Sequence, residues 1–200
     1  MNAIVMNLPT MNAIFDAAAQ MRLSAQALAA LAPAMSAREA VQALLDARLT
    51  ADALSLLARL LPHRYVVAWV CQCARREILD ARDRAGLDVA EAWLREPNAS
   101  RQAAALAFAN THRFQTLGAW IAACAGWSGG DLNPRADRPT PAPAHLSAIA
   151  AMAALSYLAA RVAAEFDPRR RAFVIDALGL LDGVDARSTR THDGIHGGTQ

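Results

Sequence analysis

The sequence contains no lysine, little net charge and few aromatic residues. Its twenty basic side chains are all arginine and are balanced by eighteen acidic ones, which gives a formal net charge of +2. That charge is too small to indicate a nucleic-acid or anionic-membrane partner. The arginines are also interleaved with acidic residues, as at 75–77 and 80–84. We attribute the missing lysine to codon usage in a GC-rich genome, and we predict no nucleic-acid partner.

The chain also lacks an apolar run long enough to span a membrane. Residues 146–160 carry no charge, but this stretch is shorter than the ~20 residues that a helical span requires. Residues 1–9 have no basic region before their apolar residues and no small-residue cleavage site, so they do not form a secretory signal. Three cysteines cannot all pair within one chain. We therefore predict a cytoplasmic protein without membrane insertion.

Motifs for metal binding and catalysis are missing as well. On a helix, Cys71 and Cys73 point roughly 200° apart, and no second ligand pair accompanies them, so we interpret them as small core residues. Ser128 lacks the strand-turn-helix context of a nucleophile elbow. Gly129-Gly130 has no following Lys-Ser/Thr and is not a phosphate loop. We predict no catalytic residue, no cofactor and no metal.

Three residues keep an enzymatic alternative open. A small-molecule enzyme without a recognisable motif would most simply assemble its site among His63, Arg64 and His112. That alternative requires a concave pocket that joins the three side chains.

Helix-forming residues dominate what is present. Alanine makes up about a quarter of the chain and has the highest helix propensity. Ser36-Ala37-Arg38-Glu39 has the form of a capping box, and Pro62 suits the first turn of a helix. We predict an all-α protein, a compact irregular bundle of about seven to eight helices with one core.

Individual helix boundaries are predicted from similar signals, which are capping residues, glycine and proline. Gly86 is expected to stop one helix, and Asp88 to open the next, which runs to Glu96. We expect an uninterrupted first helix over 10–31. The last two helices are expected over 145–166 and 168–181, the second with Asp167 as its cap.

We divide the chain into a helical domain at 10–183 between a flexible N-terminus at 1–9 and a flexible tail at 184–200. Within the domain, residues 128–144 are rich in glycine and proline and are expected to form a semi-rigid loop across the surface.

Two features indicate contact with another protein. Tryptophan is enriched at interface hot spots, and Trp127, at the edge of the glycine loop, is the one that we expect to be exposed. Arg169 to Arg171 open a helix and oppose its dipole, which favours either a solvated turn offset by Asp167 or a surface for an anionic partner. The predicted partner-binding residues are Trp127, Gly129, Gly130, Leu132, Arg169, Arg170 and Arg171.

Three motifs together resemble an uncharacterised bacterial family. They are Leu-Pro-His-Arg with Trp-Val-Cys-Gln-Cys-Ala-Arg at 61–75, Ala-Glu-Ala-Trp at 90–93 followed by Pro97, and Trp-Ser-Gly-Gly-Asp-Leu at 127–132 before a proline-rich stretch. The resemblance covers about residues 34–181. Where the family often has a second aromatic residue beside the tryptophan, this chain has Ala68.

The family resembles accessory proteins that are encoded near type VI secretion components. The resemblance implies a non-enzymatic adaptor or chaperone-like factor that binds a secretion component or effector. The alternative from another class is an immunity-type inhibitor of a toxic effector. No catalytic residue is carried over from the family.

Overall fold

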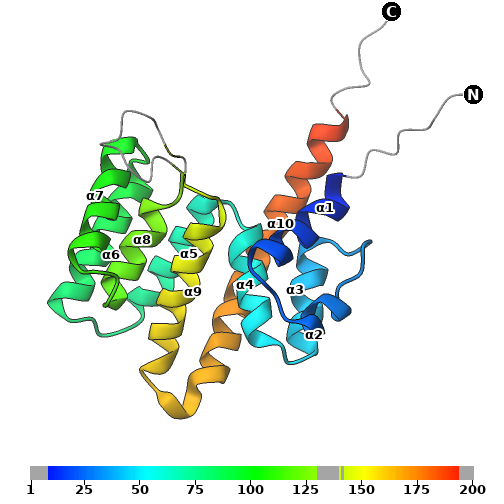
Figure 1. Cartoon of the computed structure of the whole chain (residues 1–200), viewed down its shortest axis with the longest axis horizontal. Coiled ribbons are helices and arrows are strands. Elements are labelled where there is room, and N and C mark those ends of the chain that lie inside the picture. Colours follow the sequence, from blue (N-terminus) through cyan, green and yellow to red (C-terminus); the bar gives the residue numbers. More distant parts are fainter. Residues whose placement is uncertain (1–8, 130–139, 141, 194–200) are drawn as a thin grey trace, which may run out of the picture.

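The computed structural model describes residues 9–129, 140 and 142–193, with side chains described between 13 and 182. All regular structure in these residues is helical, which confirms the predicted all-α class (Figure 1). The described helices outnumber the seven to eight expected. They are α1 (Pro9–Gln20), α2 (Ala25–Ala30), α3 (Ala37–Asp46), α4 (Thr50–Leu60), α5 (His63–Arg75), α6 (Ala81–Arg95), α7 (Ala99–Thr111), α8 (Leu117–Gly126), α9 (His145–Ala160), the 3₁₀ turn η1 (Ala163–Glu165) and α10 (Phe166–Asp193).

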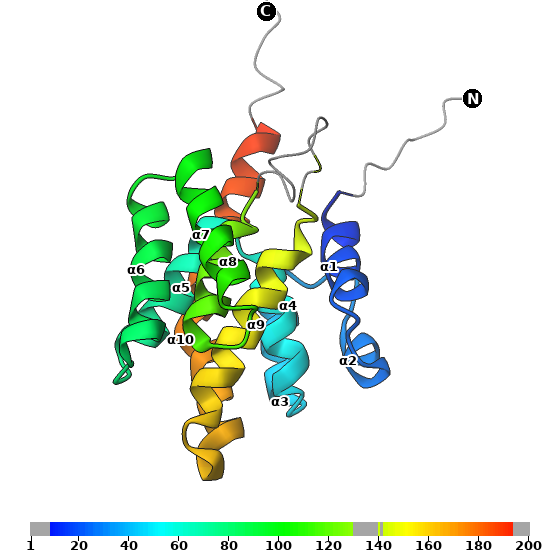
Figure 2. The ribbon, with the colours of Figure 1, turned by 60° about the vertical axis from the view of Figure 1, so that its left-hand side comes forward.

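Helix α8 lies at the centre of one half of the molecule. It packs against α6, α7 and α9, and Figure 2 shows these helices side by side. Its sequence explains this place, because it carries no charge and its residues are buried except for a partly exposed Trp120. A helix that is apolar all round is stable in water only when it is covered on every side.

Helix α10 connects α3 and α4, in the other half of the molecule, to this core. It packs against α3, α4 and α9. On α5, the buried Trp69 donates a hydrogen bond from Nε1 to the Phe173 carbonyl of α10 at 3.1 Å. A buried indole N–H needs such a partner, so this bond fixes α10 against α5.

The prediction that Gly86 ends a helix is wrong. Gly86 lies inside α6 and is buried against α8. A Cβ atom at this position would lie 2.2 Å from the Gly118 carbonyl oxygen. Gly86 therefore serves the close approach of two helices, and α6 runs unbroken through the expected start at Asp88.

The expected first helix is also divided. After α1, Arg22 adopts a left-handed conformation, and the Leu23 amide donates to the Ala18 carbonyl at 3.0 Å. Ser24 then caps α2 by accepting from the Ala27 amide at 3.1 Å. A helix termination and a new N-cap thus fall inside the range expected to be one helix.

The last two helices differ from their expected ranges. Helix α9 ends at Ala160 rather than at Phe166, and Phe166 begins α10. Helix α10 continues past Leu181 to Asp193, into the segment expected to be a flexible tail. Asp167 therefore lies within the first turn of α10 instead of preceding it.

None of the helices in the described part of the chain is both long and apolar enough to cross a membrane.

Candidate protein-interaction surface

The structure places Trp127 directly after α8, where it is the C-cap residue. Its amide donates to the Ala123 carbonyl at 2.9 Å, which fixes the backbone. The expectation of an exposed side chain is wrong, because the indole is half-buried and stacks on the Phe114 ring. The two ring centroids are 5.3 Å apart and the planes differ by 15°.

Phe114 is held by an unusual turn at the end of α7. Both Arg113 and Phe114 have positive φ angles, 51° and 56°. The Phe114 amide donates to the Ala109 carbonyl at 3.1 Å, as in a Schellman motif. Left-handed backbone is unfavourable for residues other than glycine, and such strain is concentrated at functional sites.

The turn places the Phe114 ring between two tryptophans. Its centroid is 5.4 Å from that of Trp120, with the planes tilted by 49°. Phe114, Trp120 and Trp127, here called the aromatic cluster, are each half-buried. The cluster therefore presents three aromatic side chains that are both anchored and accessible.

Sequence analysis did not identify Phe114 or Trp120 as members of this site. A signal was available for Trp120, because residues 120 and 127 are seven apart and lie on one face of a helix. No local signal marks Phe114, whose position depends on the left-handed turn.

A hydroxyl pair fixes the base of the cluster to α9. Ser147 donates to the Cys124 carbonyl at 2.8 Å, and Ser128 donates to the same oxygen at 2.6 Å. The two serine oxygens are 3.2 Å apart. These contacts join the end of α8 to the start of α9. The backbone next to Trp127 is therefore held in place.

Of the other predicted loop residues, only Gly129 can be located. It has a φ of 128°, a conformation that favours glycine, and it is half-buried. Gly130 and Leu132 lie outside the described residues, so their predicted role stays a prediction.

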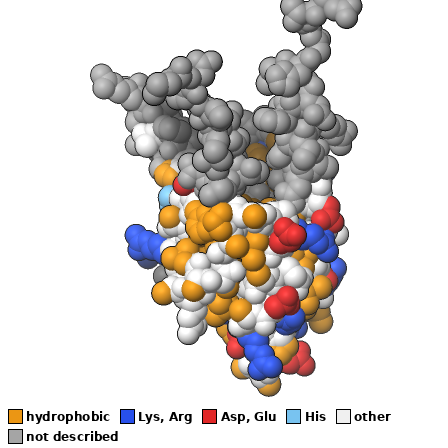
Figure 3. All heavy atoms as spheres, turned by 90° about the vertical axis from the view of Figure 1, so that its right-hand side faces the viewer, with side chains coloured by type: hydrophobic (Ala, Val, Ile, Leu, Met, Phe, Trp, Pro, Cys, Tyr) orange, Lys and Arg blue, Asp and Glu red, His pale blue; other side chains and the backbone are white. Residues whose placement is uncertain are grey.

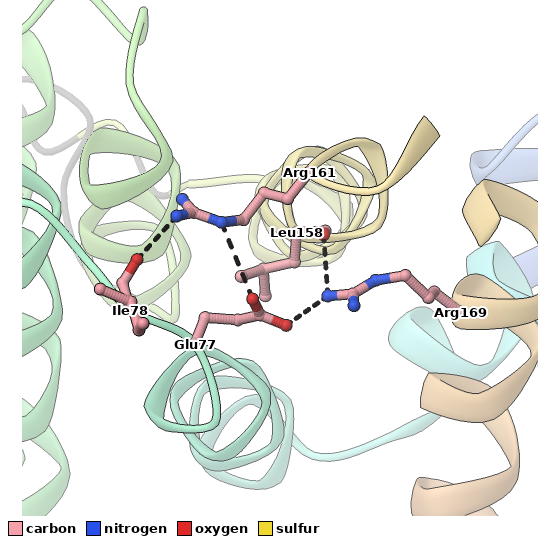
Figure 4. Close-up of polar contacts among 5 residues, drawn as sticks. All are labelled: Glu77, Ile78, Leu158, Arg161 and Arg169. Atoms are coloured by element: carbon pink, nitrogen blue, oxygen red, sulfur yellow. Dashed lines mark hydrogen bonds and ion pairs between the residues drawn. The ribbon is translucent and has the colours of Figure 1, made fainter. Parts of the chain in front are cut away.

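The three consecutive arginines are half-buried, so the interpretation as a solvated turn is wrong, but Asp167 does offset their charge as expected, since its carboxylate lies 3.8 Å from Arg170. Arg169 is paired with Glu77 and donates to the Leu158 carbonyl at 3.2 Å (Figure 4). Arg171 donates to the Leu45 carbonyl at 2.7 Å, and the Arg170 guanidinium lies 5.0 Å from the centroid of the Phe166 ring.

These contacts explain why arginine opens a helix against its own dipole. Leu158 and Leu45 lie in the last turns of α9 and α3, where a carbonyl lacks the usual amide four residues later and instead accepts from the amide three residues later, which leaves it able to accept again. A cation is favourable at such a terminus. Arg169 and Arg171 thus stabilise the ends of neighbouring helices, and their charges are engaged within the chain.

The residues of the enzymatic alternative make contacts with different elements. Arg64 donates to the Leu94 carbonyl at the end of α6, at 3.0 Å. His112 follows α7, and its ring packs on Phe108 with centroids 4.3 Å apart. His63 begins α5. No hydrogen bond, ion pair or ring contact joins the three side chains, and none of them lines either of two described surface depressions, one beside Tyr157 and one beside Arg171.

The cysteines lie in the core, as expected. Burial raises the pKa of Cys73 to about 12 and that of Cys124 to about 12, and it also raises the pKa of Cys71. All three are therefore protonated thiols at neutral pH, which are poor nucleophiles. Within the described ranges, no group of three or more histidine, cysteine or acidic side chains is placed to hold a metal ion.

The fold and this surface define an all-α protein with a cluster of three packed, half-buried aromatic side chains. Residues 40–181 match a family of unknown function, DUF6931, and the chain belongs to that family. No curated protein and no solved structure matches the chain.

Proposed function

We propose that this protein is a non-enzymatic, cytoplasmic adaptor or chaperone-like accessory factor of a type VI secretion system. It acts by binding a secretion component or effector through the aromatic cluster of Phe114, Trp120 and Trp127. The secretion context comes from the resemblance of the three sequence motifs. The aromatic cluster is the single observation that carries the binding function.

Physical chemistry supports an interface at this position. Tryptophan and other aromatic residues carry much of the binding energy in protein interfaces, because they bury a large area with little loss of side-chain entropy. A rigid cluster binds with less ordering cost than free side chains. Here each ring packs on a neighbour, and serine hydroxyls fix the backbone beside Trp127.

Partner capture with a matched variant tests the proposal. The tagged chain, expressed at its native level, is captured together with bound proteins, and the partner is identified by mass spectrometry. Trp127→Ala should weaken binding to that partner by ~2 kcal/mol, which is about 30-fold in dissociation constant. Phe108→Ala is the control, because Phe108 is also a half-buried aromatic residue but packs on His112 outside the cluster.

The outcomes separate the competing functions. Recovery of a secretion component that is lost with Trp127→Ala and kept with Phe108→Ala supports the proposal. Capture of a toxin together with growth rescue on co-expression would assign the protein to the immunity-type inhibitors instead. Equal binding by the wild type and Trp127→Ala would remove the cluster from the interface.

A further inference from the structure

A charged depression lies where the turn between α3 and α4 meets the start of α10. Its volume is about 410 Å³, and it is lined by Leu45, Asp46, Arg48, Thr50 and Arg171. In Figure 1, this turn and the start of α10 lie at the same end of the molecule. The volume falls in the range of roughly 300–1,000 Å³ that is typical of small-molecule sites.

The depression differs in kind from the hydrophobic surface of the molecule. Hydrophobic side chains gather on the side where α1 to α3 lie, but an apolar face does not by itself select one kind of partner (Figure 3). Charged groups and hydrogen-bond donors select a ligand by its charge and its geometry. The side chains that line the depression therefore indicate which ligand it binds.

One carbonyl group places both arginines at the depression. The Leu45 carbonyl accepts from the Arg171 guanidinium at 2.7 Å and from the Arg48 amide at 3.1 Å. Leu45 is buried in the core, so these two hydrogen bonds hold the half-buried Arg171 beside the backbone of Arg48. As a result, a guanidinium from α10 and one from the α3–α4 turn line the same small volume.

Neither arginine has a counter-charge in the described part of the chain. Arg169, two positions before Arg171, is paired with Glu77, whereas Arg48 and Arg171 form no ion pair with any described carboxylate. The Leu45 carbonyl orients the Arg171 guanidinium but has no net charge that could neutralise it. A guanidinium has five N–H donors, and the bond to Leu45 uses one of those of Arg171.

One acidic residue, Asp46, also lines the depression. Its carboxylate accepts from the Gln42 side-chain amide at 2.8 Å, so one of its oxygens is engaged along α3. A single carboxylate balances one of two guanidinium charges, which leaves a net positive charge among the lining side chains. The depression therefore favours an anion.

The start of α4 adds uncharged donors to the two arginines. Its N-cap, Leu49, supplies no side-chain acceptor. The carboxylate of Asp52 in the first turn accepts instead from the amide and the hydroxyl of Ser24, at 2.8 and 3.0 Å. The Thr50 hydroxyl, which lines the depression, makes no hydrogen bond with the described residues. This hydroxyl and the first-turn amides supplement the guanidinium groups, which supply the charge.

We propose that this depression binds a phosphate ester. Two guanidinium groups match the charge of a phosphate ester at neutral pH, which is about −1.5 to −2. A phosphate ester also offers three strong acceptor oxygens to donors from three elements, whereas a carboxylate offers two oxygens in one plane. The depression is larger than a bare phosphate ion, so it has room for the group that carries the phosphate. The site lies on other helices than the aromatic cluster, and it does not depend on the function proposed for that cluster.

Titration of the full chain with inorganic phosphate tests the site. In heteronuclear NMR spectra at constant ionic strength, phosphate should shift the amide signals of Arg48, Thr50 and Ala51 until they saturate, because these amides lie at the depression or in the first turn of α4. Chloride at the same ionic strength should not. The absence of a saturable shift, or equal shifts with chloride, overturns the proposal.

Substitution of an arginine tests the location. Arg48→Gln should raise the dissociation constant for phosphate about tenfold or more, because it removes a charge-assisted contact. Arg84→Gln is the matched control, since it removes the same charge from an exposed position inside α6 and should leave binding unchanged. Unchanged affinity in Arg48→Gln, or equal weakening in Arg84→Gln, contradicts the proposal. Arg48→Gly repeats the test with a residue that suits the φ of 60°, so weaker binding there cannot be attributed to a disturbed turn.

Two phosphate esters distinguish the sources of the ligand. Glycerol phosphate represents a free small molecule, and a short peptide with one phosphoserine represents a modified protein. At least one of them should bind more tightly than inorganic phosphate, and the ester that binds more tightly assigns the source. If neither ester binds more tightly than inorganic phosphate, the depression holds an adventitious ion only, and the proposal is overturned.

Discussion

Arginine occupies backbone positions that usually require glycine at three helix ends. Arg22, Arg48 and Arg113 have φ angles of 53°, 60° and 51°. In each case the next residue, which is hydrophobic, donates its amide to the carbonyl five residues earlier, as a Schellman motif requires. The left-handed conformation costs a residue with a Cβ atom roughly 1–2 kcal/mol.

Arg48→Gly should therefore stabilise the protein. Glycine adopts the left-handed conformation without the cost that arginine incurs, which stabilises the folded chain. This effect is larger than the extra entropy that glycine gives to the unfolded chain, so the free energy of unfolding should rise by about 0.5–1 kcal/mol. Urea unfolding followed by circular dichroism measures the change. Arg84→Gly, at an exposed position inside α6, is the control and should lose about 1 kcal/mol. A lower free energy of unfolding in both variants would show that contacts of the Arg48 side chain stabilise the protein by more than its left-handed backbone destabilises it.

The use of arginine rather than lysine also has a structural consequence, although its origin is attributed to codon usage. The guanidinium carries five donors in a planar group. Arg169 bonds the Glu77 carboxylate and the Leu158 carbonyl at once, and Arg64 reaches the Leu94 carbonyl at the end of α6. These contacts join distant parts of the chain, so sequence analysis could identify the arginine run as unusual but not its partners.

At the scale of the elements, capping residues predicted helix starts correctly where the interaction behind them is local. The capping box of Ser36 and Glu39 is confirmed, since each side chain accepts from the amide of the other. Thr116 likewise caps α8, because its hydroxyl accepts from the Ala119 amide at 3.1 Å. The helix end at Arg22, which adopts a left-handed conformation, was missed. Glycine is the usual signal there, and the sequence offers none.

Gly86 shows the opposite case, in which a local signal was present but had a distant cause. A glycine inside a helix costs stability, so it usually indicates a helix end. Here the cost is offset by close contact with Gly118, 32 positions away. The Gly118 amide also donates to the Asp83 carboxylate at 2.8 Å. Only knowledge of the α6–α8 crossing reveals this.

Gly86→Ala should therefore destabilise the protein by about 3 kcal/mol or more, despite the better helix propensity of alanine. The added methyl group would meet backbone atoms of Gly118, which cannot rotate away. Gly179→Ala in α10 is the matched control, because nothing lies within 4 Å of the added atom, and it should gain up to about 1 kcal/mol. Denaturant midpoints compare the two variants, and equal stability of both would refute the close crossing.

At the scale of the whole molecule, residues at the ends of three helices meet at one carboxylate, that of Glu77. Glu77 follows α5 and contacts Arg161 at the end of α9, with 3.7 Å between Nε and Oε2. It also pairs with Arg169 in the first turns of α10, and Arg161 donates to the Ile78 carbonyl at 2.6 Å (Figure 4). Glu77 thereby fixes the reversal from α9 to α10 against the end of α5.

The all-α class followed from composition and capping, because both act within single helices. The packing of α10 across α3, α4 and α9 did not, because it depends on pairs of residues far apart in sequence. Glu77 and Arg169 illustrate the difference. Glu77 is unremarkable locally, Arg169 stands out only as part of the arginine run, and their partnership exists only in the folded chain. The family match extends from residue 40 to residue 181 and so includes all three members of this network.

Glu77→Gln tests whether this network holds the two halves together. The amide keeps the size of the side chain but removes the charge that faces two arginines, and the Glu77 and Arg169 side chains are only 22% and 20% exposed. Loss of a partly buried pair leaves Arg169 without its counter-charge, so we expect the free energy of unfolding to fall by about 1–3 kcal/mol. Glu96→Gln is the control, because Glu96 is 68% exposed and lies 3.7 Å from Arg101, and it should change stability by less than about 0.5 kcal/mol. Hydrogen exchange should also rise at the start of α10 in Glu77→Gln, because that helix loses its attachment to α5. If both variants unfold at the same urea concentration as the wild type and exchange is unchanged, packing of the apolar faces alone sets the position of α10.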